Sequence, residues 1–522
     1  MTGRKLFVLA FGLLSFCFIP SAPLHAVPAY AVKDIVKFQT WPELRLSYNK
    51  ISNTGDLKTS EGDGLDYASY IYRIPISLQY RSNMSFFVNL IAEGPSHYAA
   101  PLNDLETFVE GSKVKKNGGS ASIGYPQISE LWLKLYLTYN HSLQIGQAPY
   151  VVGQGYALGG QYNNYGITYA FQKADKFRWR LRYSILDVEN RISILRSKTN
   201  EKYLGRAADS SAYLLATDID VKSGDLTLQP YFGWLHDQTS LEDRNSSTFF
   251  GNAAQQFKAK EDNIYTFGGS AAYDSPYADI SFEFAKNAGK TTGQPNQNWG
   301  SDIHHSGYLI HSEIKGHLGI FTPRAKYILA SGNESKIEDL PGALAGTLKR
   351  NENAAFTVFS PLNTNLVDSY AHLAPVPVVA MAGGYGMNYG IRRPGTYNDP
   401  HVWENLNAYN LGINIIPHEK VFMMVDYWYL KAVNPAIGRN TAGTLVALPR
   451  DLVSEIDYYA TYTPCKMFTV GVHGGYFMPG AYYKASRIDA PATWNGAASQ
   501  TVRVDGTADA AYQVELFFVT HF

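Results

Sequence analysis

The stretch Ala511-Tyr-Gln-Val-Glu-Leu-Phe-Phe-Val-Thr-His-Phe522 ends the chain and decides how the rest of the sequence is interpreted. Every second residue from Tyr512 to Phe522 is apolar or nearly so, and the residues between them include Gln513 and Glu515. A period of two residues is typical of a β-strand with one apolar and one polar face. We therefore predict a strand that runs to an aromatic last residue.

The N-terminal residues agree with a protein that leaves the cytoplasm. Arg4 and Lys5 precede an apolar run over 6–19, and small residues follow, among them Ala29-Tyr-Ala31. This pattern predicts a secretory signal peptide over 1–31, cleaved after Ala31, with Ala26 as the second candidate. The leader and the aromatic-ended strand together predict a β-barrel in the outer membrane of a Gram-negative bacterium, with Phe522 recognised by the barrel-assembly machinery.

Composition narrows the choice of architecture. After the leader, no apolar run is long enough for a membrane helix, so a spanning chain must close its sheet to pair all its backbone groups. Aromatic residues make up 14% of the chain and include 38 tyrosines, which suit the interfacial girdles of a barrel in contact with lipid and lipopolysaccharide. The 45 basic and 45 acidic residues leave no basic footprint for nucleic acid. We predict one all-β domain over 32–522.

Alternating segments recur along the chain, and short and long gaps between them take turns. The predicted strands are 41–50, 64–80, 83–98, 127–139, 142–152, 162–172, 176–188, 210–223, 225–236, 262–274, 276–287, 302–315, 318–331, 402–417, 420–431, 454–464, 466–478 and 510–522. Short periplasmic turns and long extracellular loops are the rule in bacterial barrels. An even count of about 18 strands lets the first and last strands pair antiparallel.

One apolar stretch, over 378–390, does not fit the order of short and long gaps if it is a strand. We therefore assign it to a single long loop over 332–401. A loop of this length has a function or no order of its own, and we predict that it folds into the pore.

The alternation assigns side chains to two faces. In 127–139, four leucines at 131, 133, 135 and 137 oppose Glu130, Trp132 and Lys134. In 176–188, three arginines oppose Trp179, Leu181 and Tyr183. A soluble sandwich would bury the apolar face and expose the charges, and alternation alone does not separate the two folds. Both chain ends favour the barrel, with its apolar face toward lipid.

Inward charges then decide what passes through a water-filled lumen. The predicted basic pore residues are Arg45, Arg73, Arg81, Lys134, Arg178, Arg180, Arg182, Arg324 and Lys326. The predicted acidic ones are Glu93, Asp218, Asp220, Glu283, Asp426, Glu455, Asp457 and Glu515. Because basic residues lie mostly on early strands and acidic ones on late strands, we expect them to face each other across the pore. The ladder of Arg178, Arg180 and Arg182 suits successive carboxylates or phosphates of a polyanion, and pairing with nearby acids is the alternative.

Enzyme and cofactor motifs are sparse. The sequence has no G-x-S-x-G, H-E-x-x-H, P-loop or C-x-x-C-H motif. Glycines at 153, 155, 159 and 160 superficially resemble a dinucleotide loop, but no helical pattern follows, so a barrel loop with tight turns is favoured. His304 and His305 fall on opposite faces of a strand, which argues against a metal site that uses both with His311. We predict no cofactor, no metal and no catalysis.

Several segments resemble the alginate export family of outer-membrane proteins. Glu130-Leu-Trp-Leu-Lys-Leu-Tyr-Leu and then Leu143-Gln-Ile-Gly-Gln147 resemble a strand–turn–strand of that family, in which an Arg often precedes the Gln; here Gly146 stands in its place. The segments that resemble its closing strands are Asn410-Leu-Gly-Ile-Asn, Asp426-Tyr-Trp-Tyr-Leu, Ser454-Glu-Ile-Asp-Tyr and Gly474-Gly-Tyr-Phe-Met-Pro-Gly480. The resemblance covers 127–152 and 402–480. It implies an 18-stranded barrel whose charged constriction passes an anionic polysaccharide.

These observations lead to one functional prediction and three rivals. We predict an outer-membrane channel for passive passage of a hydrophilic, anionic solute or polysaccharide. The rivals are a general porin with weak selectivity, a barrel sheath around a partner protein such as a multihaem cytochrome, and a membrane-embedded hydrolase with loop-borne acids.

Overall fold

The computed structural model describes residues 36–52, 65–94, 127–148, 150–160, 165–185, 212–237, 258–294, 299–332, 350–354, 356, 406–435, 437–439, 445–447, 449–481 and 509–522. The named elements in these residues are all β-strands. Among them we find no helix with the length and apolar character needed to cross a membrane. The predicted leader over 1–31 lies outside the described residues, and so does nearly all of the predicted pore loop over 332–401.

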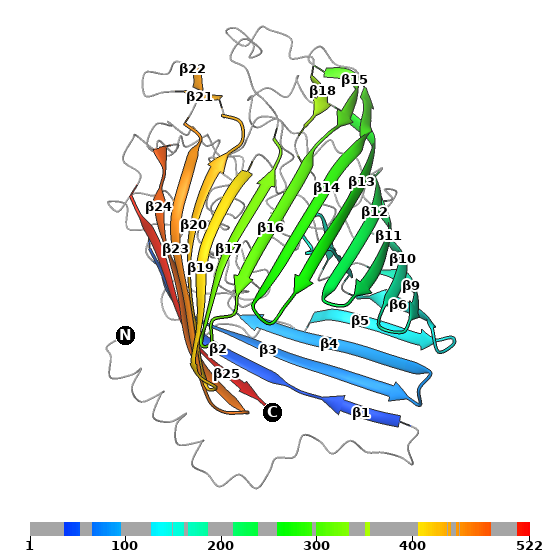
Figure 1. The fold of residues 1–522 in the computed structure, drawn as a ribbon, viewed down its shortest axis with the longest axis vertical. Coiled ribbons are helices and arrows are strands. Elements are labelled where there is room, and N and C mark those ends of the chain that lie inside the picture. The colour runs from blue at the N-terminus through cyan, green and yellow to red at the C-terminus, as the bar shows by residue number, and fades with distance from the viewer. Residues whose placement is uncertain are drawn as a thin grey trace.

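Eighteen of the described strands form one closed, antiparallel barrel (Figure 1). In order around the barrel they are β2 (Glu43–Ser52), β3 (Leu65–Tyr80), β4 (Met84–Gly94), β5 (Gln127–Tyr136), β6 (His141–Gln147), β9 (Tyr165–Lys173), β10 (Phe177–Ile185), β11 (Ala212–Ser223), β12 (Leu226–Asp237), β13 (Lys258–Asp274), β14 (Ala278–Gln294), β16 (Tyr308–Gly316), β17 (Phe321–Ala330), β19 (Leu406–His418), β20 (Val421–Ala432), β23 (Asp451–Cys465), β24 (Phe468–Pro479) and β25 (Ala511–His521).

The barrel closes between its first and last strands. β25 pairs with β24 on one side and with β2 on the other, in a register that runs from Glu43 opposite His521 to Ser52 opposite Tyr512. The backbone N–H of Phe522 donates to the carbonyl of Pro42 at 2.9 Å, so pairing continues to the end of the chain. The eighteen predicted strands correspond one to one with this ring, which confirms the predicted closed all-β barrel and excludes the soluble sandwich.

The other seven described strands are not part of this closed ring. β1 (Val36–Thr40) extends the sheet along β3, and β15 (Trp299–His305) pairs with β14 and, in parallel, with β18 (Arg350–Asn353). β21 (Ile437–Arg439) and β22 (Leu445–Ala447) form a separate hairpin, and so do β7 (Tyr150–Val152) and β8 (Leu158–Gly160). Figure 1 places β15, β18, β21 and β22 at the end of the barrel opposite the C-terminus.

Two predicted strands were wrong in part. The predicted strand 142–152 ends at Gln147, because Gly146 has a φ of 124° and the chain then leaves the barrel wall. A Cβ on Gly146 would lie 2.2 Å from the carbonyl oxygen of Leu131, so this close approach excludes any side chain. The predicted strand 302–315 is two strands, since β15 ends at His305 and β16 begins at Tyr308.

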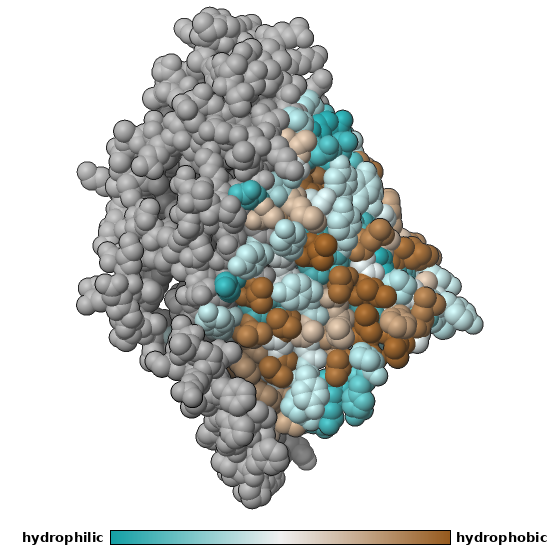
Figure 2. Space-filling model, turned by 90° about the vertical axis from the view of Figure 1, so that its left-hand side faces the viewer, coloured by the Kyte–Doolittle hydropathy of each residue, from teal (hydrophilic) through white to brown (hydrophobic). Residues whose placement is uncertain are grey.

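The two faces of the wall are reversed relative to a soluble protein. On β10 the apolar side chains of Leu181, Tyr183 and Ile185 are 37%, 43% and 57% exposed, whereas Arg182 between them is 2% exposed. On β23, Ile456 is exposed while Glu455 and Asp457 are buried. Figure 2 shows apolar residues gathered in a band on the described face, with more hydrophilic residues above and below it. The charged face is therefore the interior of the barrel, as predicted.

Candidate functional site

The chain segment that connects β6 to β9 lies against the inner face of the barrel. This inner segment, residues 150–160 with Ala148 before it, contains the β7–β8 hairpin and turns at Gly153 and Gly155, whose φ values are 61° and 80°. Val152, Ala157 and Leu158 are no more than 1% exposed. These glycines belong to a tight barrel loop, as the sequence suggested, but the sequence did not place that loop inside the lumen.

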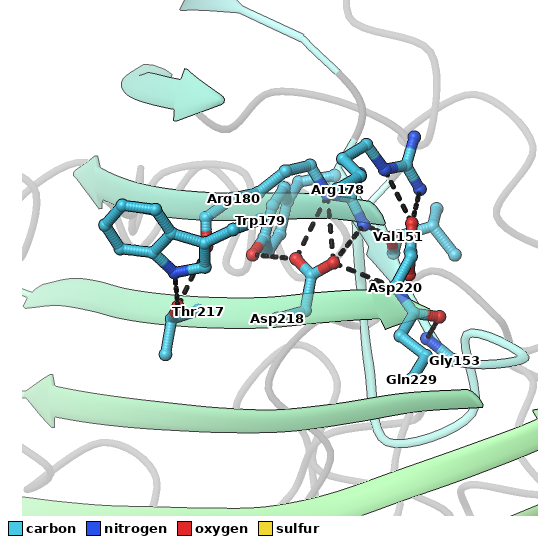
Figure 3. Close-up of polar contacts among 10 residues, drawn as sticks. Val151, Gly153, Arg178, Trp179, Arg180, Thr217, Asp218, Asp220 and Gln229 are labelled. Atoms are coloured by element: carbon cyan, nitrogen blue, oxygen red, sulfur yellow. Dashed lines mark hydrogen bonds and ion pairs between the residues drawn. The ribbon is translucent and has the colours of Figure 1, made fainter. Parts of the chain in front are cut away.

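Arg180 on β10 and Asp218 on β11 anchor the start of the inner segment. The two residues are cross-strand neighbours, and the guanidinium contacts the carboxylate through Nε at 3.1 Å and Nη2 at 3.0 Å (Figure 3). The same Nη2 donates to the carbonyl of Val151 at 2.9 Å. Arg180 thus ties the wall and the inner segment together.

Tyr150 fills the space between two arginines. Its hydroxyl donates to Oδ1 of Asp218 at 2.8 Å, and its ring centroid lies 5.0 Å from the Arg180 guanidinium and 5.2 Å from that of Arg182. Cation–π contacts of this kind gain strength where water is excluded. Burial, together with the charge of Asp218, raises the pKa of the Tyr150 hydroxyl, so it stays a hydrogen-bond donor.

Arg182 donates hydrogen bonds to three groups of the protein. Its Nη2 donates to the carbonyl of Ala148 at 3.1 Å, Nη1 donates to Thr168 Oγ1 at 3.1 Å, and Nε donates to Ser184 Oγ at 2.6 Å. The bond to Ala148 holds the chain where it leaves the wall. The bond to Thr168 crosses to β9, and the bond to Ser184 stays within β10.

Glu283 on β14 binds the middle of the inner segment. Its carboxylate accepts hydrogen bonds from the backbone N–H of Gln154 at 2.8 Å and from the Tyr231 hydroxyl at 2.7 Å. The backbone N–H groups of Tyr156 and Ala157 also hydrogen-bond to it. Four donors on one buried carboxylate form a strong, charge-assisted attachment.

Two further wall residues complete the attachment. Gln229 Oε1 accepts from the N–H of Gly153 at 2.8 Å, and Gln229 Nε2 donates to Asp218 Oδ2 at 3.0 Å. The ring of Tyr156 stacks on His311 with a centroid distance of 4.2 Å. The inner segment is therefore attached to wall strands from β10 to β16.

The predicted arginine ladder exists, but its partners are not those expected. Arg178 pairs with Asp220 and Arg180 with Asp218, in both cases on neighbouring strands. The expectation that basic and acidic residues face each other across the pore was wrong for these pairs, because cross-strand neighbours lie closer than opposite walls. Of the three arginines, Arg178 is the most open to water, with a side chain 43% exposed against 18% for Asp220.

A second group of charges lies on β16 to β23. Arg324 makes a two-point ion pair with Asp426, with Nε at 3.0 Å from Oδ1, and Asn410 Nδ2 donates to the same oxygen at 3.1 Å. Lys326 lies 3.6 Å from Glu313. Asp457 is the cross-strand neighbour of Asp426, and both carboxylates are buried. Arg324 and Lys326 thus pair with acids of the wall.

A third group lies where the barrel closes. Arg45 on β2 donates to Glu515 Oε1 on β25 at 2.8 Å, and His473 Nε2 lies 2.8 Å from Glu515 Oε2. The Arg45 guanidinium also lies 4.0 Å from the centroid of the Phe517 ring. The seam of the barrel is thus held by buried polar contacts as well as by the backbone ladder.

The remaining predicted pore residues are more loosely placed. Arg73 lies 3.8 Å from Glu43, and Lys134 Nζ lies 5.0 Å from the centroid of the Tyr136 ring. Arg81 was wrongly assigned to the lumen: it is an exposed residue of the β3–β4 turn with a φ of 48°. The side chain of Glu93 lies outside the described residues.

Sequence reasoning missed Tyr150 of the inner segment and the uncharged wall residues around that segment. Tyr150, Gln229, Tyr231 and His311 carry no motif, and only their contacts reveal a role. One signal was present: the glycine-rich stretch 150–160 includes Val152, Ala157 and Leu158, which is too apolar for a loop surrounded by water. His304 is exposed and His305 buried, as expected for strand neighbours, and the described residues contain no cluster of metal-ligating side chains.

Comparison with known proteins adds little to this geometry. No protein-family model and no curated protein matches the chain. Among solved structures, OccK2 (OpdF) of Pseudomonas aeruginosa in complex with glucuronate is 8% identical, covering 93% of this chain and 98% of that chain with a TM-score of 0.46. OccAB2 of Acinetobacter baumannii is 9% identical, with the same two coverages and a TM-score of 0.46. At this similarity nothing about function follows, and the resemblance to the alginate export family stays a prediction.

Proposed function

We propose that this protein is an outer-membrane channel for the passive passage of hydrophilic solutes. The observation that carries the proposal is the reversed barrel: a closed ring of eighteen described strands with apolar side chains exposed outside and charged ones buried inside. Exposed Leu181, Ile185 and Ile456 would each cost free energy in water and are favoured in hydrocarbon. Closure also leaves no unpaired sheet edge within the ring, which a lipid environment requires.

The bore of such a channel is wide enough for solutes. A barrel of sixteen to eighteen strands encloses more space than side chains fill, and known examples hold water. Here the inner segment occupies part of that space against β10 to β16 and narrows it. The sequence predicts that the loop 332–401 narrows the pore. The contacts of the inner segment support this narrowing role for residues 150–160.

We further propose a preference for anionic solutes, carried by Arg178. Its guanidinium is the part of the ladder that water reaches, while its partner Asp220 is more covered. An anion near Arg178 therefore meets more of the positive than of the negative charge. The resemblance to the alginate export family extends this proposal to an anionic polysaccharide.

Single-channel recording in planar bilayers tests both statements. The purified protein should give stable conductance steps. In a salt gradient, the sign of the reversal potential should show that anions permeate more readily than cations. Arg178→Glu should shift the reversal potential in the direction of cation selectivity, with little change in the single-channel conductance. Absence of conductance, or a protein that stays monodisperse without detergent, would contradict the channel itself.

One rival is favoured by a specific observation. Arg180, Arg182 and Arg324 all have partners within the protein, which lowers the field available to passing ions. A weakly selective general porin fits this pairing. Equal permeation of neutral sugars and organic acids of similar size, with no effect of Arg178→Glu, would establish that alternative.

A further inference from the structure

Three aromatic rings form a row on the inner face of the barrel near its short-turn end, and two of them stack. The ring centroids of Trp41 and Phe87 are 6.3 Å apart, and those of Phe87 and Trp132 are 5.3 Å apart with planes inclined by 24°. Register shows that they face inward: Phe87 lies opposite Ser77, which shares its face of β3 with buried Ile71. Since aromatic girdles of barrels face lipid, this aromatic row needs another explanation.

At the Trp132 end of the row, the next two strands carry glycines. Phe87 covers one face of the Trp132 indole from β4, whereas its neighbour on the other side, on β6, is Gly146. Beyond Gly146, the next position across, on β9, is Gly166. Two adjacent strands therefore place no side chain beside the indole, and both glycines are partly exposed.

Stacking on Phe87 holds one face of the indole. Glu130, two residues earlier on β5, lies on the same inner face of the wall. Polar groups follow on the same face, with Lys134 opposite Gln144 in the next inward row. A fixed aromatic face, a backbone floor and nearby hydrogen-bonding groups suit a solute with a flat C–H face and a rim of hydroxyls.

We propose that Trp132 is the platform of a sugar-binding subsite, on which a pyranose ring stacks above Gly146 and Gly166. The C–H bonds of the pyranose pack on the indole, and Gln144 and Lys134 meet its hydroxyls. An aromatic solute would also stack, but the polar rim of this site favours the sugar. The subsite rests on the proposed channel function and adds a substrate class to it.

Blockade of single-channel current by a neutral probe, maltohexaose, tests the subsite. In the wild type, sugar should interrupt the current in a concentration-dependent manner. Trp132→Ala should weaken the apparent affinity about tenfold, the loss of one good stacking contact, while Trp132→Phe should keep most of it. Trp179→Ala is the matched control, because Trp179 lies on the opposite face of the wall beside Leu181 and should leave the blockade unchanged.

The outcomes separate the subsite from the channel. Steady conductance with no blockade by maltohexaose, or blockade that Trp132→Ala does not weaken, would overturn the subsite and leave the channel standing. Benzoate blockade that depends on Trp132, without any by maltohexaose, would also overturn the sugar assignment. In this experiment, absence of conductance in the wild type would count against the channel itself.

Discussion

Two regions of the inner wall carry similar residues and use them differently. On β10 to β14, Arg180, Arg182 and Glu283 bind both wall side chains and the backbone of the inner segment. On β17 to β23, Arg324 pairs with Asp426, which also accepts a hydrogen bond from Asn410. All three residues lie on wall strands. The first region positions a piece of chain within the lumen, and the second stabilises the wall alone. Inward alternation of charges is therefore compatible with either role.

The comparison gives distinct expectations for mutations in the two regions. Changes on β17 to β23 should lower the free energy of unfolding and leave the conductance nearly unchanged. Changes on β10 to β14 should alter the conductance more than the stability, because the attachment of the inner segment is lost while the wall remains. The following four substitutions test this contrast.

The largest effect on stability is expected for Asp426→Asn. This change leaves the Arg324 guanidinium buried without its countercharge, which costs about 3–5 kcal/mol. Urea unfolding in detergent, followed by tryptophan fluorescence, measures the loss, and the open-channel current should stay close to that of the wild type. A large rise in current would show that this wall also holds a constricting segment.

Glu283→Gln should have the next largest effect, and it should fall on the inner segment. The amide keeps one acceptor oxygen and loses the charge, so donors from Gln154, Tyr156 and Ala157 lose about 2–3 kcal/mol of attachment. We expect a larger conductance and faster hydrogen exchange over 150–160. If exchange there is unchanged, Glu283 does not anchor the segment.

Tyr150→Phe should produce a smaller version of the same result. It removes one hydrogen bond to the Asp218 carboxylate, about 1.5 kcal/mol, and keeps the ring between Arg180 and Arg182. The conductance should lie between those of the wild type and Glu283→Gln. A conductance above that of Glu283→Gln would reverse the order of the two anchors.

Asp220→Asn should have the smallest effect on stability and a distinct effect on selectivity. The pair with Arg178 is partly exposed, so its loss should cost less than about 1 kcal/mol. Removal of the carboxylate leaves Arg178 with more of its positive field, and the reversal potential in a salt gradient should shift further toward anions. No shift would remove Arg178 from the proposed selectivity.

Much of the fold was predictable from local pattern. Alternation along each strand gave the faces of Leu181 and Arg182, and the order of short and long gaps gave the antiparallel order. The candidate site was predictable only in part. Arg178, Arg180 and Arg182 were expected to line the pore, but their partners depend on register between strands, which a single sequence does not specify. The sequence did not predict that the inner segment lies in the lumen, because the backbone conformation at Gly146 that ends β6 has no recognisable sequence motif.

The sequence by itself determined the class of structure, since a period of two residues with apolar and charged faces allows a closed sheet with a reversed interior. It also determined which side chains of a regular strand share a face. Tertiary structure alone decided that Asp218 meets Arg180 and Tyr150, that Glu283 meets the backbone of 154–157, and that Trp132 has glycines beside it. The physical reason is that face depends on neighbours along one strand, whereas partners depend on registers between strands far apart in the chain.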